Sequence, residues 1–283
     1  MKVIIRINCP DKTGIISSVT QFIHSCSGNV IYLDQHVDKS SNVFFMRLET
    51  EFDPSNFNTD TFKNNFKQAI ALPYNMRWSL HLDTTRPKMA LFVSKYNHCL
   101  YDLLGRHNSG ELAVEIPFIL SNHPDLKFIA DQFNIPFYHV PFSKENREKA
   151  EKKQLALLAE HQIDFIVLAR YMQIVSNRLI DVFPNRIINI HHSFLPAFAG
   201  AKPYHAAFKR GVKIIGATSH YVTTALDEGP IIEQDVIPVS HSHTIADFIS
   251  KGRDLEKIVL SRAIKLHVLR KTMVYNNKTV IFS

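Results

Sequence analysis

The chain has 283 residues, 45% of them hydrophobic and 21% charged, with a formal net charge of +7 at pH 7, which suits a globular protein of one or two domains. No apolar run approaches the roughly 18 residues needed to span a bilayer, and no signal-peptide cleavage site follows the N-terminus, so we expect a cytoplasmic protein without a membrane partner. The basic residues are scattered rather than interleaved with aromatic ones, which argues against a nucleic-acid partner.

Residues 1–83 follow a strand–helix–strand–strand–helix–strand pattern. The expected elements are, in order, Lys2–Asn8, Ile15–Cys26, Val30–Val37, Asn42–Glu51, Thr59–Leu72 and Tyr74–Leu82. The first helix places Val19, Phe22 and Ile23 on one face and ends before Gly28. This βαββαβ order predicts a ferredoxin-like N-terminal domain.

After a short polar linker, residues 84–87, strands alternate with helices. We expect strands at Lys88–Val93, Val114–Leu120, Phe137–Val140, Asp164–Ala169, Arg186–Ile190, Val212–Val222 and Ile231–Pro238, and helices at Cys99–Gly105, Pro124–Phe133, Lys144–His161, Pro203–Arg210 and Thr244–Leu269. Residues 273–282 resemble a hairpin. The alternation predicts that residues 88–283 form an α/β, Rossmann-like domain, whose mostly parallel sheet is covered on both faces.

Three polar residues in the second domain have the functional groups for acyl chemistry. Asn189 and His191 lie at the end of an apolar strand, on the same face because side chains alternate, and Asp227 follows in a turn. An amide can donate to an oxyanion, an imidazole can carry a proton near neutral pH, and a carboxylate can orient the imidazole or a water. No Ser or Cys nucleophile signature lies beside them, so we expect the acyl group to pass to water or to a second substrate.

The histidines and cysteines do not predict a metal site. The chain contains no HExxH motif, and its three cysteines, Cys9, Cys26 and Cys99, have no metal-ligand spacing. Their odd number also argues against a disulfide framework. The adjacent His191 and His192 are expected to point to opposite faces of their strand.

Several segments together resemble the folate-dependent formyltransferase superfamily. They are CPDKTGI, VSKYNHCLYDLL, SNHPDL, LARYMQIVS, NIHHSFLPAF, LDEGPIIEQDV and GRDLEKIVLSRA, in this order along nearly the whole chain. The whole chain is similar to those members that join an N-terminal ACT-like module to the catalytic domain and hydrolyse 10-formyltetrahydrofolate. The resemblance implies release of formate and tetrahydrofolate, which supplies formate for purine biosynthesis and balances the one-carbon folate pool. The alternative is formyl transfer to an amine acceptor.

The resemblance also implies roles for individual residues. Asn189, His191 and Asp227 match the superfamily's catalytic Asn, His and Asp. The folate is the substrate, and neither a metal nor another cofactor is implied. The segment Arg170–Ile174 matches the loop that embraces the pterin ring, and residues 223–227 are expected to line the same pocket. The substrate-binding residues are therefore expected to be Met172, Gln173, Ile174, Thr224 and Leu226.

One loop departs from the superfamily pattern. Where the nucleotide formyltransferases have a glycine-rich loop for the acceptor's phosphate, this chain has Ser94–His98, without a glycine. A loop crowded with side chains cannot bring its backbone N–H groups as close to a phosphate, which favours water as the acceptor. Two interpretations of His98 and Lys95 stay open: they close off the acceptor pocket, or they are surface residues.

Other polar residues have less specific signals. His192 stands where the transferases usually have Pro, and we expect it to support the site rather than to act in it. His220 is expected to support Asp227 or simply to pack. Arg253-Asp254 and Glu256 are expected on a solvated helix face or in intrachain ion pairs.

The N-terminal module has its own candidate site. ACT-like domains bind amino-acid effectors at the turn between the first strand and helix, usually across a dimer interface. The resemblance therefore implies an amino-acid effector at Asp11 and Gly14, and a homo-oligomer, either a dimer or a tetramer. The alternative is a purely structural dimerisation module, because a fold alone does not establish a function.

Overall fold

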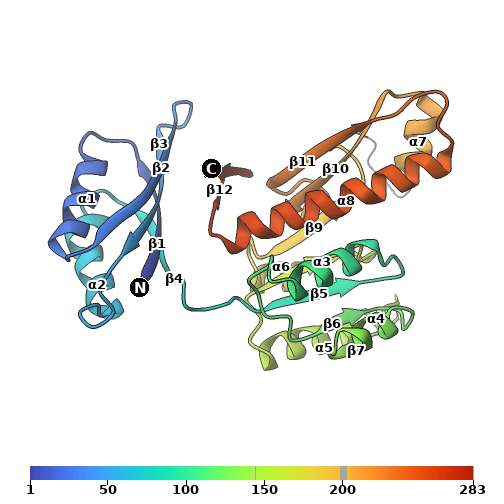
Figure 1. Ribbon diagram of the computed structural model, residues 1–283, viewed down its shortest axis with the longest axis horizontal. Helices are drawn as coiled ribbons and strands as arrows, with labels where there is room; N and C mark the ends of the chain where they lie inside the picture. Colours follow the sequence, from blue (N-terminus) through green and yellow to red (C-terminus); the bar gives the residue numbers. More distant parts are fainter. Residues whose placement is uncertain (144, 198–202, 283) are drawn as a thin grey trace. The chain divides into compact units, whose positions relative to one another are not determined.

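The computed structural model describes residues 1–143, 145–197 and 203–282 (Figure 1). Contacts within the chain divide it into two compact units, and the N-terminal segment of the first unit ends at Arg86, inside the predicted linker of residues 84–87. Lys144, where we predicted a helix to begin, and Phe198 of the NIHHSFLPAF motif lie outside the described residues.

The first unit has the predicted βαββαβ order of elements. They are β1 (Lys2–Pro10), α1 (Ile15–Ser25), β2 (Asn29–Asp38), β3 (Val43–Glu51), α2 (Thr59–Phe66), the π-helical turn η1 (Lys67–Ala71) and β4 (Arg77–Leu82). The strands form a four-stranded sheet in the order β2-β3-β1-β4, with every neighbouring pair antiparallel. Val19 and Ile23 of α1 and Phe62 and Phe66 of α2 are buried in the apolar core of this unit.

The part of the chain from Pro87 onward contains the predicted α/β alternation and a final hairpin. Its elements are β5 (Met89–Val93), α3 (His98–Asn108), β6 (Ile119–Ser121), α4 (Lys127–Gln132), β7 (Phe137–His139), α5 (Arg147–Glu160), β8 (Phe165–Leu168), α6 (Asn177–Val182), β9 (Ile187–His191), α7 (Pro203–Arg210), β10 (Ile214–Tyr221), β11 (Ile231–Pro238), α8 (Ile245–Val268), β12 (Thr272–Tyr275) and β13 (Lys278–Ile281). The sheet order is β11-β10-β9-β8-β5-β6-β7. The five strands from β5 to β9 pair in parallel, whereas β10 is antiparallel to both β9 and β11. The prediction of a mostly parallel sheet is therefore confirmed.

Apolar side chains cover both faces of this sheet. Along β5, Leu91 belongs to a core cluster with residues of α3 and α8, while its neighbour Phe92 belongs to a second cluster with residues of α5. Helix α8 runs along β10 and β11 (Figure 1). Burial on both faces explains why the central strands are almost continuously apolar in sequence.

The end of the chain differs from the predicted domain boundary. Residues Arg270–Met273 and those from Val280 onward group with the first unit, although the sequence interpretation placed all of 88–283 in the second domain. The physical reason lies in two arginines of the first unit's sheet. Arg6 donates from Nη1 to the carbonyl oxygen of Thr272 at 2.9 Å, and Arg47 donates from Nε to that of Arg270 at 3.1 Å.

Two local features were not predicted. The helix expected over Thr59–Leu72 changes from α- to π-helical geometry at Lys67. Helix α6 has only six residues and was missed; the Oγ of Ser176 accepts from the backbone N–H of Leu179 and caps it. No helix in the described part of the chain is long and apolar enough to cross a membrane.

Candidate active site

The candidate site lies where neighbouring strands of the second sheet end at different points. Strand β8 stops at Leu168, whose register partner in β9 is Asn189, so β9 continues past its neighbour to His191. The segments that follow β8 and β10 enclose a cavity of about 430 Å³ at this edge. Cavities of this size hold small organic ligands, and the carboxyl edge of a parallel sheet is where such ligands bind.

The structure brings all eight predicted catalytic and substrate-binding residues together in this cavity. They are Met172, Gln173, Ile174, Asn189, His191, Thr224, Leu226 and Asp227. Three of them are apolar side chains with unusually large exposure: Met172 at 46%, Ile174 at 60% and Leu226 at 63%. A flat, partly apolar ligand in the cavity would cover these side chains, and their burial would favour its binding.

One ring nitrogen of His191 contacts Asp227, and the other has no hydrogen-bond partner among the described residues. Its Nδ1 lies 3.3 Å from Oδ2 of Asp227, while its buried Nε2 has no hydrogen-bond partner among the described residues. With Asp227 ionised, Nδ1–H donates to the carboxylate, so a neutral His191 carries its lone pair on Nε2. The arrangement leaves a proton acceptor ready for a group that enters the cavity.

Asn189 is oriented by a histidine on the neighbouring strand. His220 lies directly opposite Asn189 in the β9–β10 pair, and its Nε2 is 3.2 Å from Nδ2 of Asn189. The Nδ1 of His220 is 2.9 Å from the carbonyl oxygen of Tyr221, which can only accept. A neutral His220 therefore accepts from Asn189 through Nε2. This contact fixes the amide and leaves its second N–H for a ligand.

Asp227 is held in a turn with unusual backbone geometry. Its φ of 57° is in the left-handed region, which Asp tolerates better than most residues. The hydrogen bond from His191 and then the nearby His220 ring, whose Nε2 lies 3.6 Å from Oδ1, hold the pKa of Asp227 well below its ordinary value, against the raising effect of partial burial. The carboxylate is therefore ionised throughout the neutral range.

Gly229 allows this turn to approach β10 closely. A Cβ atom at Gly229 would overlap the backbone carbonyl oxygen of Tyr221. We expect Gly229→Ala to lower the free energy of unfolding by about 1–3 kcal/mol, because the backbone must shift to admit the methyl group. We also expect kcat to fall, because Asp227 would move with the turn.

Chemical denaturation and turnover assays check this expectation. The matched control is Gly105→Ala in α3, where an added Cβ would meet nothing within 4 Å. The control should be neutral or stabilising by up to about 1 kcal/mol. Equal unfolding midpoints for Gly229→Ala and the wild type would contradict the close approach.

Known proteins are similar to this chain over most or all of its length. A family model described as formyl transferase matches residues 87–264. A formyltetrahydrofolate deformylase of Synechocystis sp. is 52% identical over 277 residues, which cover 98% of this chain and 97% of the relative. The crystal structure of a formyltetrahydrofolate deformylase from Pseudomonas syringae pv. tomato is similar with a TM-score of 0.97 at 44% identity, over 100% of this chain and 95% of that one. The chain belongs to the formyltetrahydrofolate deformylase family.

A glycinamide ribonucleotide transformylase shares only part of this architecture. The crystal structure of this enzyme from Symbiobacterium toebii is similar with a TM-score of 0.67 at 26% identity, over 72% of this chain and 98% of that one. The similarity to formyltetrahydrofolate deformylases thus extends over the whole chain, and the similarity to this transformylase does not.

We predicted that His192 points away from His191, and this prediction is wrong. Strand β9 ends at His191, so strand alternation does not extend to the next residue. The rings of His191 and His192 lie 5.2 Å apart, and both residues line the cavity. The His192 ring also contacts the ring of Tyr204 at 5.8 Å, which gives it a supporting position beside the catalytic candidates.

Arg170 is a cavity-lining residue to which we assigned no individual role. It is buried, has a left-handed φ of 63°, and begins the loop that contains Met172. An arginine in a loop gives no sequence signal of burial. Its location next to the catalytic candidates is visible only in the structure.

The two predicted effector residues lie together in the first unit. Asp11 and Gly14 line a cavity of about 490 Å³ with Lys12, Ser17 and Gln35. Gly14, with φ 92°, begins helix α1 in a left-handed conformation that favours glycine. The cavity offers polar groups of both signs, and an effector there stays a prediction.

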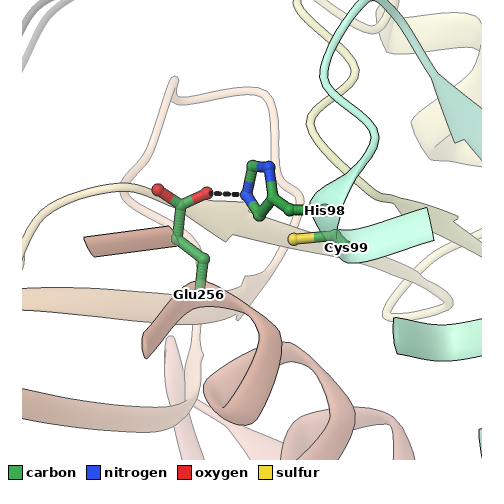
Figure 2. A group of neighbouring side chains, drawn as sticks. All are labelled: His98, Cys99 and Glu256. Carbon is green, nitrogen blue, oxygen red and sulfur yellow. Dashed lines mark hydrogen bonds and ion pairs between the residues drawn. The ribbon is translucent and has the colours of Figure 1, made fainter. Parts of the chain in front are cut away.

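Glu256 is not on a solvated face of α8. Its side chain is fully buried and forms a hydrogen bond with His98 and an ion pair with Arg170, so only the ion-pair part of our expectation is correct. Figure 2 shows Glu256 facing His98, with Cys99 beside it. These three residues place potential metal-ligand atoms within 4.8 Å of one another.

The chemistry of this cluster fits an ion pair better than a metal site. His98 Nε2 and Glu256 Oε2 are 2.8 Å apart, whereas ligand atoms around tetrahedral zinc lie roughly 3.3 Å apart. Burial and then the charge of Glu256 raise the pKa of the Cys99 thiol well above its ordinary value, so the sulfur stays protonated. Arg170 already supplies the positive charge that balances the buried carboxylate of Glu256.

Proposed function

We propose that the chain hydrolyses 10-formyltetrahydrofolate to formate and tetrahydrofolate, without a metal or another cofactor. The observation that carries the proposal is His191, which lines one cavity with Asn189 and Asp227 and whose Nε2 has no hydrogen-bond partner among the described residues. The names of the full-length relatives support the same activity. The exposed apolar side chains of Met172, Ile174 and Leu226 suit contact with the pterin ring.

The first step is the addition of water to the formyl carbon. The Nε2 of neutral His191 takes a proton from the water as its oxygen bonds to that carbon, and Asp227 stabilises the resulting imidazolium through Nδ1–H. The formyl oxygen gains negative charge and accepts the second N–H of Asn189. One such preoriented donor lowers the barrier by about 3–4 kcal/mol.

The second step is the loss of the folate amine. The bond between the formyl carbon and N10 breaks, and the proton on His191 Nε2 passes to N10. The products are formic acid, which releases its proton to solvent, and tetrahydrofolate. Atoms and charges balance with water as the only co-reactant, and none of the described side chains forms a covalent bond to the substrate.

The decisive experiment measures formate release from 10-formyltetrahydrofolate with no acceptor amine present. We expect multiple turnovers, with one formate and one tetrahydrofolate formed per substrate consumed. Turnover that depends on an added amine would instead establish the alternative, a formyltransferase. Repeating the assay with a panel of free amino acids tests the effector site at Asp11 and Gly14.

The proposal extends to the role of the reaction in the cell. Formate release would supply formate for purine biosynthesis and return tetrahydrofolate to the one-carbon pool. Homo-oligomerisation through the N-terminal unit and a cytoplasmic location stay predictions. Light scattering on the purified protein tests the first of these.

A further inference from the structure

Glu256 connects three parts of the second unit in its interior. Its Oε1 accepts from the hydroxyl of Tyr204 at 2.6 Å, and its Oε2 lies 2.8 Å from Nε2 of His98 and 3.4 Å from Nε of Arg170. Burial alone would raise the pKa of Glu256, but the hydrogen bond from His98 and the charge of Arg170 lower it below its ordinary value. A buried carboxylate with these partners is ionised and fixed in place.

The glycine-free loop Ser94–His98 contacts the segment Arg170–Ile174, which matches the pterin-binding loop, at three points. The Oγ of Ser94 accepts from the backbone N–H of Met172 at 2.9 Å. The guanidinium carbon of Arg170 lies 4.9 Å from the centre of the Tyr96 ring. His98 completes the attachment through Glu256 (Figure 2).

This network lies directly behind the catalytic cavity. Arg170 and His192 both line the cavity beside His191, and Tyr204, which donates to Glu256, contacts the ring of His192. Among the described residues, neither His98 nor Glu256 is itself part of the cavity lining. The network therefore supports one side of the cavity from outside.

We propose that Arg170, which Tyr96, His98 and Glu256 hold in place from outside the cavity, forms with them an acceptor wall that closes the catalytic cavity to any formyl acceptor larger than water. The inference rests on the proposed hydrolase function and extends it to acceptor specificity. An amine acceptor needs a space next to the formyl carbon in which its nitrogen and the rest of its body fit. Here Tyr96 and Glu256 hold the side chain of Arg170 at the edge of the cavity, where it would occupy room that such an acceptor needs. His98 and Tyr96 are positioning residues, because they act through Arg170.

The test is the competition between water and an amine in variants of the wall. In the side reaction, the nitrogen of glycinamide bonds to the formyl carbon, the bond from that carbon to N10 breaks, and the proton that the amine loses passes to N10. N-formylglycinamide and formate are quantified together by mass spectrometry, with glycinamide in large excess. The wild type is expected to give formate alone.

The double variant Tyr96→Ala/His98→Ala is expected to raise the ratio of N-formylglycinamide to formate by about 10-fold or more, since opening a pocket by one side chain changes acceptor discrimination on this scale. The single variant His98→Gln should keep formate as the main product, because the amide N–H of the glutamine can still donate to Glu256. The matched control is His107→Ala, a partly buried histidine on the same helix. It should behave as the wild type.

Three outcomes decide between this proposal and others. A correctly folded double variant that still gives only formate would overturn the acceptor wall while leaving the hydrolase function intact. Weaker tetrahydrofolate binding with an unchanged product ratio would also overturn it, because that is the effect of a purely structural role. A wild type that formylates glycinamide in preference to water would overturn both the wall and the proposed function.

Discussion

Asp227→Asn is expected to lower kcat for formate release by about 10²–10⁴-fold, the usual contribution of a general acid–base system. The substitution keeps the shape of the side chain and removes its charge, so His191 loses the carboxylate that fixes its tautomer and stabilises its protonated form. Tetrahydrofolate should bind nearly as well as to the wild type, because the apolar rim of the cavity is untouched. Single-turnover kinetics and equilibrium binding separate these two quantities.

Asparagine is a suitable replacement because it tolerates the left-handed backbone at this position. A large loss of activity would then report on charge rather than on a displaced turn. Near-normal turnover by a folded Asp227→Asn protein would rule out the proposed role. A loss of folate binding in parallel with kcat would instead make Asp227 a binding residue.

The same variant has a pH signature in stability. The folded-state pKa of Asp227 is below its ordinary value of 3.8, so the ionised carboxylate stabilises the fold above that pH and loses this contribution as the pH falls. The asparagine side chain of the variant does not titrate. The difference in unfolding free energy between the wild type and Asp227→Asn should therefore shrink below about pH 4.

Asn189→Ala is expected to lower kcat by about 10²–10³-fold, as the loss of one oxyanion donor does in other acyl-transfer enzymes. His220 orients the Asn189 amide in advance, so we expect the amide to stabilise the transition state more than the bound substrate. The Michaelis constant should change much less than kcat. The matched control is Asn177→Ala, an exposed asparagine at the start of α6.

The two asparagine variants give a clear comparison. Unchanged turnover in Asn177→Ala with a large loss in Asn189→Ala would assign the loss to the cavity. If Asn189→Ala raised the Michaelis constant and left kcat unaltered, Asn189 would bind the ground state of the substrate and would not be the oxyanion donor.

Local sequence patterns predicted the elements that carry the catalytic candidates, but not that these candidates act together. The apolar run before Asn189 and His191 predicts a buried strand, and the turn residues around Asp227 predict a loop. The resemblance to the formyltransferase superfamily linked the two segments, which are far apart along the chain. The structure places all three side chains in one cavity.

Local sequence patterns did not predict the buried position of Glu256 or its electrostatic partners. Glu256 was expected to be solvated or ion-paired, because a glutamate in a helix is usually exposed. The positions of Gly252, Leu260 and Ala263, all buried on α8, show that Glu256 lies on the inward stripe of that helix. This periodicity is a signal that could have predicted its burial. Its partners His98 and Arg170, from other elements, could not be inferred from α8 alone.

His192 shows a second limit of pattern reasoning. Alternation holds only while the backbone stays extended, and the sequence does not mark where β9 ends. One residue past the strand, the side chain turned towards the cavity instead of away from it.

The position of the cavity within the chain has a consequence for how such proteins can change over evolution. Among the residues that the structure describes, those that line it all fall between Leu168 and Asp227. The catalytic candidates and the residues around them are therefore inherited together on one segment of the chain. Recombination that replaced residues 1–86 would exchange most of the first unit without altering any residue that lines the cavity.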